Sequence, residues 1–198
     1  MDKQLLIEMA LFTPTRSSLN ESMGGSNRMI VEGLIQKAET KNGNGRIYPY
    51  EVLKREADKY LQGPVRERRA LGELDHPDSQ VINLRNASHA IREVWWRGDE
   101  IWGKVEIFAD AGDLGTSSGR IAGALVRNGL LIGISSRGMG SLKQVGEIME
   151  VQDDFELVCF DLVSEPSTTG AFMLKEGMKP NLFTKADRIN RILNSIIK

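Results

Sequence analysis

The stretch Gly133-Ile134-Ser135-Ser136-Arg137-Gly138-Met139-Gly140 follows an apolar run from Leu130 to Ile132 and has two serines at its centre. Its glycines permit another chain to approach closely in or beside a strand, because a glycine has no side chain to keep a neighbour away. The stretch therefore predicts a strand whose serine hydroxyl is open to another polypeptide. A buried strand that ends in a Gly/Ser turn is the alternative interpretation.

The segments around this stretch predict a chain that is rich in strands. Apolar and period-two patterns predict strands over residues 29–38, 87–96, 101–108, 130–136, 141–151 and 155–163. Helical spacing predicts helices over about 49–62 and near 121–126, and an amphipathic helix over about 185–197. The predicted strands follow one another too often for a doubly wound α/β sheet. We therefore expect an α+β, β-rich fold: an antiparallel β-barrel, closed or nearly closed, surrounded by a few helices.

The composition along the chain predicts three regions. Residues 1–26 have the mixed Gly, Ser, Thr and Pro content of a flexible N-terminal segment. Residues 27–170 contain the predicted barrel, and residues 171–198 form a looser tail that ends in the amphipathic helix.

The overall composition is that of an ordinary globular protein and excludes several classes. A net charge of −1 gives no overall attraction to nucleic acid or to an anionic membrane. The chain has no apolar run of about 18 residues and no signal-peptide pattern at its start. Its single cysteine, Cys159, forms no internal disulfide, which favours a reducing compartment. We expect a soluble protein of a cytoplasm.

Three side-chain types that hydrolysis by a nucleophile needs occur at separate places in the chain. An imidazole that works near neutral pH must be His76 or His89, because the chain contains only these two histidines. His76 lies at the tip of a predicted loop, whereas His89 lies within a strand, where a structural role is expected. Asp161 lies in an apolar strand and needs a partner if it is buried. Together with Ser135 or Ser136, these residues offer a nucleophile, a base and an acid.

A metal site is the less favoured interpretation of the same region. Asp75, His76 and Asp78 carry groups that bind metals, but no second well-spaced histidine accompanies them and Cys159 is far away in sequence. We expect neither a metal nor a cofactor.

Three blocks of the sequence, in this order, resemble the prohead core protease of T-even-type tailed phages. They are Leu71-Gly72-Glu73-Leu74-Asp75-His76-Pro77, Val94-Trp95-Trp96-Arg97-Gly98 and Gly133-Ile134-Ser135-Ser136-Arg137-Gly138-Met139-Gly140-Ser141. Supporting matches are Gln4-Leu5-Leu6-Ile7-Glu8 and Arg46-Ile47-Tyr48-Pro49. The resemblance covers roughly residues 1–170, and the tail after it matches less clearly.

The resemblance implies a fold similar to the herpesvirus assembly proteases, a β-barrel ringed by helices, over residues 27–170. It also implies a serine endopeptidase that cleaves scaffold and capsid proteins inside the immature phage head, before DNA packaging. The expected location is therefore the prohead interior within the host cytoplasm. The expected partners are phage scaffold core and capsid proteins as substrates, not nucleic acid or a membrane, and association into a homo-oligomer is left open.

The resemblance also assigns roles to single residues. His76 matches the catalytic histidine of the family and Ser135 matches the nucleophile, with Ser136 as the second candidate. Asp161 is the expected third member because it occupies the late strand where the herpesvirus relatives place theirs, and Glu165 is the alternative. Oxyanion donors or substrate-binding groups are expected from the backbone of Ser136, Arg137 and Gly138.

Proteases of this kind cleave after the Glu of a pattern that reads apolar residue, any residue, Glu. Leu6-Ile7-Glu8, in the predicted flexible start, and Leu174-Lys175-Glu176, in the tail, match this pattern. Ile30-Val31-Glu32 matches as well, but it lies in a predicted strand that a protease could not thread through its site. The sequence therefore predicts self-cleavage after Glu8 or Glu176, and cleavage after Glu176 would remove the last helix.

Two other function classes compete with this interpretation. A non-catalytic scaffold or core component of the same fold would be expected to lose the His/Ser pair, which this chain retains. An esterase that acts on small molecules is disfavoured because the chain has no Gly-x-Ser-x-Gly elbow.

Overall fold

The computed structural model describes residues 3–10, 29–130 and 132–164, which form a mixed α+β fold rich in strands. The α-helices within these ranges are α1 (Tyr50–Tyr60) and α2 (Ser117–Arg127). The strands within them are β1 (Gln4–Ala10), β2 (Met29–Lys37), β3 (Arg46–Ile47), β4 (Leu71–Glu73), β5 (Ala87–Arg97), β6 (Glu100–Ile107), β7 (Gly133–Gly140), β8 (Leu142–Val145), β9 (Ile148–Val151) and β10 (Glu156–Val163). The predicted α+β, β-rich class is confirmed.

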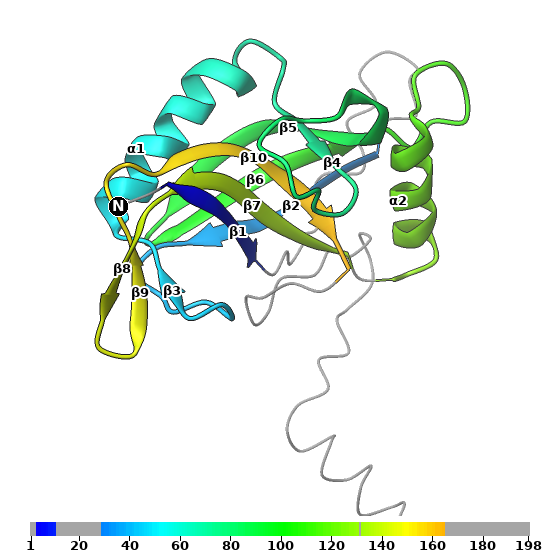
Figure 1. Cartoon of the computed structure of the whole chain (residues 1–198). Helices are drawn as coiled ribbons and strands as arrows, with labels where there is room; N and C mark the ends of the chain where they lie inside the picture. The colour runs from blue at the N-terminus through cyan, green and yellow to red at the C-terminus, as the bar shows by residue number, and fades with distance from the viewer. Residues whose placement is uncertain (1–2, 11–28, 131, 165–198) are drawn as a thin grey trace, which may run out of the picture.

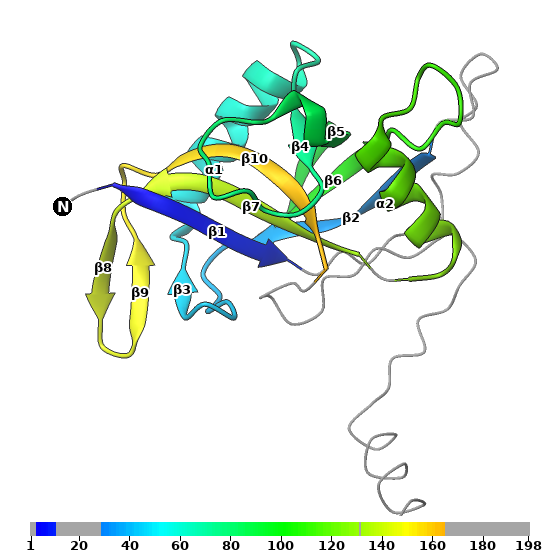
Figure 2. The ribbon, with the colours of Figure 1, turned by 45° about the vertical axis from the view of Figure 1, so that its right-hand side comes forward.

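The described strands pair into three sheets. One sheet has the order β1-β7-β10, with β7 antiparallel to both of its neighbours. A second sheet has the order β2-β6-β5-β4 and is antiparallel throughout. The third and smallest has the order β3-β9-β8. Figure 1 and Figure 2 show the β8–β9 hairpin at one end of the molecule and α2 at the other, with β1, β7 and β10 running between them.

The two larger sheets share one hydrophobic core. Ile134 from β7 and Leu162 from β10 belong to the same cluster of buried residues as Val31 from β2 and Val105 from β6. Helix α1 contributes Leu53 to this cluster. One face of β7 is thus fixed by packing, which holds the double serine in a defined orientation.

The two larger sheets also meet along one edge. Leu74, just after β4, forms an isolated parallel bridge with Leu162 on β10. The pairing of the described strands gives three sheets and not one closed ring. A closed barrel, and a likeness to the herpesvirus proteases, therefore stay predictions.

Several predicted elements are confirmed with small shifts at their ends. The predicted strands over 29–38, 87–96, 101–108 and 155–163 correspond to β2, β5, β6 and β10, and that over 130–136 corresponds to β7. The predicted helix over 49–62 is α1, which buries Val52, Leu53, Ala57 and Tyr60 on one side. Gly63-Pro64 does not stop it at once, because residues 61–65 continue as a turn of π-helix. Helix α2 is capped by Thr116, whose side chain accepts a hydrogen bond from the Gly119 N–H at 2.9 Å.

The structure differs from the prediction at the N terminus. Residues 4–10 of the predicted flexible segment form β1, which pairs with β7 along its whole length. The Leu6 side chain is fully buried in the core, so apolar burial and the β7 ladder order this part of the chain. Residues 11–26, the tail over 171–198, the helix over 185–197, Glu165 and Glu176 lie outside the described residues.

The region over 141–151 also differs from the single strand that was predicted. It forms the β8–β9 hairpin, whose turn contains Gly146 with a φ of 62°. Neither described helix is long and apolar enough to cross a membrane.

Candidate active site

The double serine lies on the central strand of its sheet, with its two hydroxyls on opposite faces. Ser135 on β7 is the direct cross-strand partner of Asp161 on β10. Because side chains alternate along a strand, Ser135 and Asp161 share one face, whereas Ser136 points to the other. The second candidate for the nucleophile, Ser136, is thus directed away from Asp161. Arg137, two residues after Ser135, returns to the Asp161 face.

His76 belongs to a segment, residues 75–83, that we term the histidine loop. Asp75 begins the loop with a φ of 65°, a left-handed conformation that Asp adopts more readily than most residues. The Asp75 N–H donates to the Leu162 carbonyl at 2.7 Å, which fastens the start of the loop to β10. This attachment brings His76 beside Asp161, although the two are 85 positions apart.

The imidazole of His76 lies between the serine and the carboxylate. Its Nδ1 is 2.8 Å from Asp161 Oδ2, and its Nε2 is within hydrogen-bonding distance of Ser135 Oγ. Asp161 and Ser135 are fully buried, whereas 11% of the His76 side chain is exposed. The three predicted residues are thus brought together in the order that a hydrolytic triad requires: hydroxyl, imidazole, carboxylate.

The Asp161 carboxylate is held by several donors. Its Oδ1 accepts from the Glu73 N–H at 2.9 Å and from Arg137 Nη2 at 3.2 Å. Arg137 Nε is 2.9 Å from Oδ2, an ion-pair contact without the alignment of a hydrogen bond. Burial alone would raise the pKa of the Asp161 carboxyl. The hydrogen bonds from His76 and Glu73 and the charge of Arg137 outweigh burial and keep that pKa below its usual value.

Arg137 is itself fully buried and links three parts of the site. Its Nη2 donates to Glu73 Oε1 at 2.9 Å, and its Nη1 donates to the Ser79 carbonyl in the histidine loop at 2.7 Å. Burial opposes the charge of the guanidinium, but the Asp161 and Glu73 carboxylates outweigh burial and raise the pKa of Arg137, so it stays protonated. The side chain of Arg137 therefore connects Asp161, Glu73 and the histidine loop.

The other histidine, His89, has the structural surroundings that were expected for it. Its Nε2 donates to the Phe160 carbonyl at 3.0 Å, and its Nδ1 lies 2.9 Å from Ser88 Oγ. Burial lowers the pKa of His89 to about 4, so the ring is neutral near pH 7. It connects β5 to the residue that precedes Asp161.

The structure does not support the predicted oxyanion role of Ser136, Arg137 and Gly138. All three have pairing partners on both β1 and β10, so their backbone N–H groups face neighbouring strands. The sequence predicts that the glycines of β7 leave room for another polypeptide, but Gly138 makes room for Phe155 of the same chain. A Cβ at Gly138 would lie 2.5 Å from the Phe155 ring, so the space beside this glycine is filled by the protein itself.

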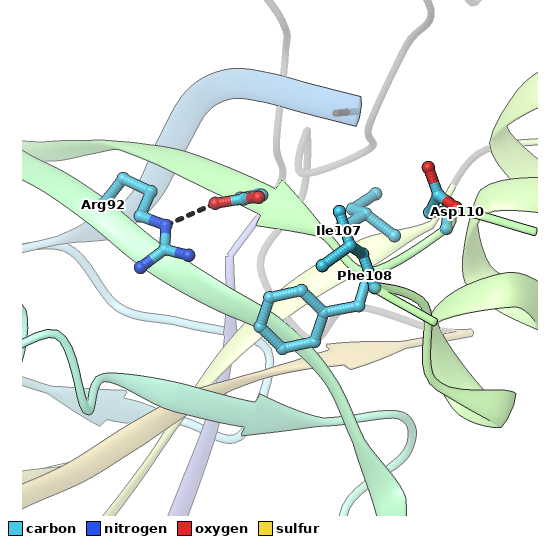
Figure 3. A pocket seen from close by; sticks show the side chains of 7 residues that line it. Arg92, Ile107, Phe108 and Asp110 are labelled. Carbon is cyan, nitrogen blue, oxygen red and sulfur yellow. Dashed lines mark hydrogen bonds and ion pairs between the residues drawn. The ribbon is translucent and has the colours of Figure 1, made fainter. Parts of the chain in front are cut away.

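A separate pocket, with a volume of about 190 Å³, lies where β6 leads towards α2. Figure 3 shows Arg92 reaching an acidic side chain at its edge, the Glu106 carboxylate, while Phe108 and Asp110 line the other parts. Its remaining lining residues are Ile107, Ala109 and Leu114. Ser135, His76 and Asp161 are absent from the lining of this pocket. The pocket is therefore no part of the candidate active site.

The chain has known relatives in both sequence and fold. Residues 4–182 match the family described as prohead core protein serine protease. The chain belongs to this family. It is similar to the prohead core protein protease of Enterobacteria phage T4, with 31% identity over 169 residues that cover 84% of this chain and 78% of the T4 protein. The resemblance found in the sequence is confirmed.

A solved capsid assembly protease shares the fold as well. The structure of the bacteriophage T4 capsid assembly protease matches with a TM-score of 0.71 and 29% identity, covering 84% of this chain and 100% of that chain. Membership of a peptidase family supports peptide-bond hydrolysis as the activity of this member.

Two residues of the site were missed by reasoning from the sequence. Glu73 stands in the block that carries His76 but was given no role, and Arg137 was expected to contribute only its backbone, to an oxyanion hole or to substrate binding. A charged residue inside a strand of small residues was the available signal, because a buried guanidinium requires partners.

Proposed function

We propose that the chain is a serine endopeptidase in which Ser135 is the nucleophile, His76 the general base and Asp161 the residue that orients His76. The observation that carries this proposal is the single imidazole that contacts Asp161 Oδ2 through Nδ1 and Ser135 Oγ through Nε2. A buried carboxylate that accepts from Nδ1–H holds the ring in the tautomer whose Nε2 can accept the hydroxyl proton.

In the proposed reaction, Ser135 Oγ bonds to the scissile carbonyl carbon while His76 Nε2 takes the hydroxyl proton. The imidazolium then gives this proton to the leaving amine as the C–N bond breaks, which leaves an acyl-enzyme. A water molecule deprotonated by the same imidazole releases the acyl group. Asp161 stays ionised throughout and stabilises the imidazolium.

The proposed substrates are the scaffold core and capsid proteins of a phage prohead, cut in the prohead interior within the host cytoplasm. The family description and the names of the T4 relatives support this assignment. The proposed cleavage site is the bond after Glu in an apolar-x-Glu sequence. The chain's own Leu174-Lys175-Glu176 sequence fits this pattern and makes self-cleavage at Glu176 part of the proposal.

One observation favours the alternative, a non-catalytic core component of the same fold. Ser135 is fully buried, so a polypeptide reaches its Oγ only after part of the protein moves. The same burial is expected of a protease that is silent before assembly, so cleavage itself must be measured.

The test is cleavage of a peptide that contains Leu-Lys-Glu-Gly by the wild type, by Ser135→Ala and by Ser136→Ala. We expect cleavage after Glu by the wild type and by Ser136→Ala, and a loss on the order of 10⁴-fold or more in Ser135→Ala. Equal cleavage by wild type and Ser135→Ala would exclude Ser135 as the nucleophile. If the full chain is inactive, the assay is repeated with a chain that ends at Glu176, and inactivity of both favours the non-catalytic alternative.

A further inference from the structure

Next to the candidate triad, and bound to the same arginine as Asp161, lies a second carboxylate that the proposed reaction does not use. Glu73, on β4, is fully buried. Its Oε1 accepts from Arg137 Nη2 at 2.9 Å and from the Asn83 N–H, at the end of the histidine loop, at 3.0 Å. Its Oε2 has no hydrogen-bond partner among the described residues. A buried carboxylate is costly unless it is paired and hydrogen-bonded, and in Glu73 the described partners reach only one of the two oxygens.

The formal charges of this buried cluster do not balance in the resting state. Two carboxylates, Glu73 and Asp161, share one guanidinium, that of Arg137, and all three side chains are fully buried. With all three ionised, the cluster carries a net charge of −1. Transfer of the Ser135 proton to His76 creates an imidazolium that cancels this charge. Glu73, Asp161, Arg137 and the imidazolium then sum to zero, while the negative charge formed in the same step lies on the oxyanion of the substrate. A buried cluster that carries −1 in advance thus favours the imidazolium of the transition state over the neutral ring of the ground state.

Arg137 would weaken the triad if Glu73 were neutral. Its Nε lies 2.9 Å from Asp161 Oδ2, the same oxygen that contacts His76 Nδ1. A guanidinium paired with Asp161 alone would cancel the charge that stabilises the imidazolium. Glu73 supplies a second negative charge to Arg137 through a separate hydrogen bond.

We infer that Glu73 is a positioning residue that acts through Arg137, an inference that rests on the proposed function. The charge of Glu73 neutralises the guanidinium, which keeps the negative charge of Asp161 available to the His76 imidazolium. Glu73 touches neither substrate nor the reacting atoms in this scheme. Its two hydrogen bonds also hold the Arg137 guanidinium and the N–H of Asn83, the last residue of the histidine loop.

The other titratable groups around the site do not perform this task. On β10, burial raises the pKa of the Cys159 thiol, whose sulfur is 3.4 Å from Asp161 Oδ1, so it stays neutral. On α1, burial raises the pKa of Tyr60, and on β5 burial keeps His89 neutral. Asp75 and Asp78, in the histidine loop, are exposed, and water screens their charges.

Glu73→Gln isolates the charge with little change in shape. The amide oxygen keeps the acceptor position for Arg137 and Asn83, and the amide nitrogen takes the place of Oε2. The matched control is Glu56→Gln on α1, because the Glu56 side chain is also nearly buried, with 5% exposed, and is held by Arg55 and Lys59. Glu73→Asp keeps the charge and serves as the conservative variant.

The measurement is the NMR titration of the histidine ring carbons in the full chain, which requires no activity. Burial lowers the pKa of the other histidine, His89, to about 4, which sets its signal apart. We expect the His76 midpoint to fall by on the order of 1 pH unit in Glu73→Gln, the effect of one nearby charge at an effective dielectric constant of ~20. Glu56→Gln should titrate like the wild type, and Glu73→Asp should restore most of the shift. An unchanged midpoint in folded Glu73→Gln overturns the inference.

Activity assays separate this inference from the proposed function. With an active wild type, the acidic limb of the pH–rate profile of Glu73→Gln should move to lower pH and its plateau should fall by up to ~10-fold. If the full chain and the chain that ends at Glu176 are both inactive while the His76 midpoint still moves, the proposed function fails and the charge relation stands. If Glu73→Gln does not fold, the carboxyl ¹³C shift of Glu73 in the wild type decides: an ionised Glu73 at pH 7 supports the inference, and a protonated one overturns it.

Discussion

The Asp75 N–H donates to the Leu162 carbonyl at 2.7 Å, so the residue before His76 is fastened to the residue after Asp161. This one backbone hydrogen bond therefore fixes the position of His76 relative to Asp161. The Ser135 position is fixed to the same place by the pairing of β7 with β10, in which Ser135 and Asp161 are direct partners. The relative placement of the three residues thus depends on backbone hydrogen bonds as well as on side-chain contacts.

The left-handed conformation of Asp75 should be sensitive to substitution. Asp75 has a φ of 65°, at which a β-branched residue is strained. Asp75→Val is therefore expected to lower the free energy of unfolding by about 1–3 kcal/mol. Asp75→Asn should stay within about 0.5 kcal/mol of the wild type, because Asn tolerates this conformation. Urea denaturation measures both, with Asp78→Val as the control at an exposed position in the same loop. Equal stability of Asp75→Val and Asp78→Val would contradict the assigned backbone conformation.

Asp161→Asn should abolish most of the proposed activity while the fold survives. The amide can no longer hold the His76 tautomer whose Nε2 accepts a proton, and losses of about 10⁴-fold in kcat are known for this change in a triad. KM should change little, since Asp161 is fully buried and does not reach the substrate. The measurement is steady-state peptide cleavage, and the control is Asp154→Asn, which alters a carboxylate bound to Ser141 outside the site. A loss of less than tenfold would remove Asp161 from the triad.

Local patterns in the sequence were enough to place the candidate catalytic residues on their elements. The apolar run before Ser135 predicted a strand, and the polar, proline-containing stretch after Leu74 predicted a loop that carries His76. The argument that a buried Asp161 needs a partner was also sound, because its partners are His76, Arg137 and the Glu73 N–H.

The relations between distant segments could not be predicted in the same way. The contact between Glu73 and Arg137 joins residues 64 positions apart and depends on how β7, β10 and β4 meet, which no local pattern encodes. The sequence predicts a flexible start in place of β1 because seven residues give a weak periodic signal. The order of β1 comes from its pairing with β7. The oxyanion role predicted for Ser136, Arg137 and Gly138 meets a related obstacle, because these residues pair with a strand on each side and their N–H groups face those strands.

Gly72 should tolerate no side chain. A Cβ at this position would lie 2.0 Å from the Phe160 carbonyl oxygen and 2.4 Å from two atoms of the His89 ring, and all of these are buried. Gly72→Ala must therefore push β4 away from β10 and is expected to cost at least about 1–3 kcal/mol of stability. Thermal and urea denaturation measure this loss. Gly63→Ala is the control, because nothing lies closer than 3.7 Å to its Cβ position. A variant Gly72→Ala as stable as Gly63→Ala would refute the close approach of β4 to β10.

Of the two predicted self-cleavage sites, after Glu8 and after Glu176, we expect only the second to be cut. The bond after Glu8 lies within β1, where residues 4–10 pair with β7, and a protease needs an extended chain that is free of such pairing. We expect mass spectrometry of the active protein to show a new C terminus at Glu176 and an N terminus that does not begin at Met9. Glu176→Gln should keep the full length, while Glu8→Gln should be trimmed like the wild type. A chain that begins at Met9 would show that β1 leaves the sheet during activation.

The buried histidine should make the folded state weaker as the pH falls towards 4. Burial lowers the pKa of His89 from 6.5 to about 4, so between these values the unfolded chain binds a proton that the folded chain does not. Stability contributed by the neutral ring is complete above pH 6.5 and declines as the pH falls, by about 3 kcal/mol at pH 4. His89→Gln keeps a donor for the Phe160 carbonyl but cannot titrate, so its unfolding free energy should vary less with pH over this range. Urea denaturation of both proteins at several pH values gives the difference, in which the contribution of His76 cancels. Parallel curves would mean that His89 takes up its proton in the folded state, and that the bond from its Nε2 to β10 does not depend on a neutral ring.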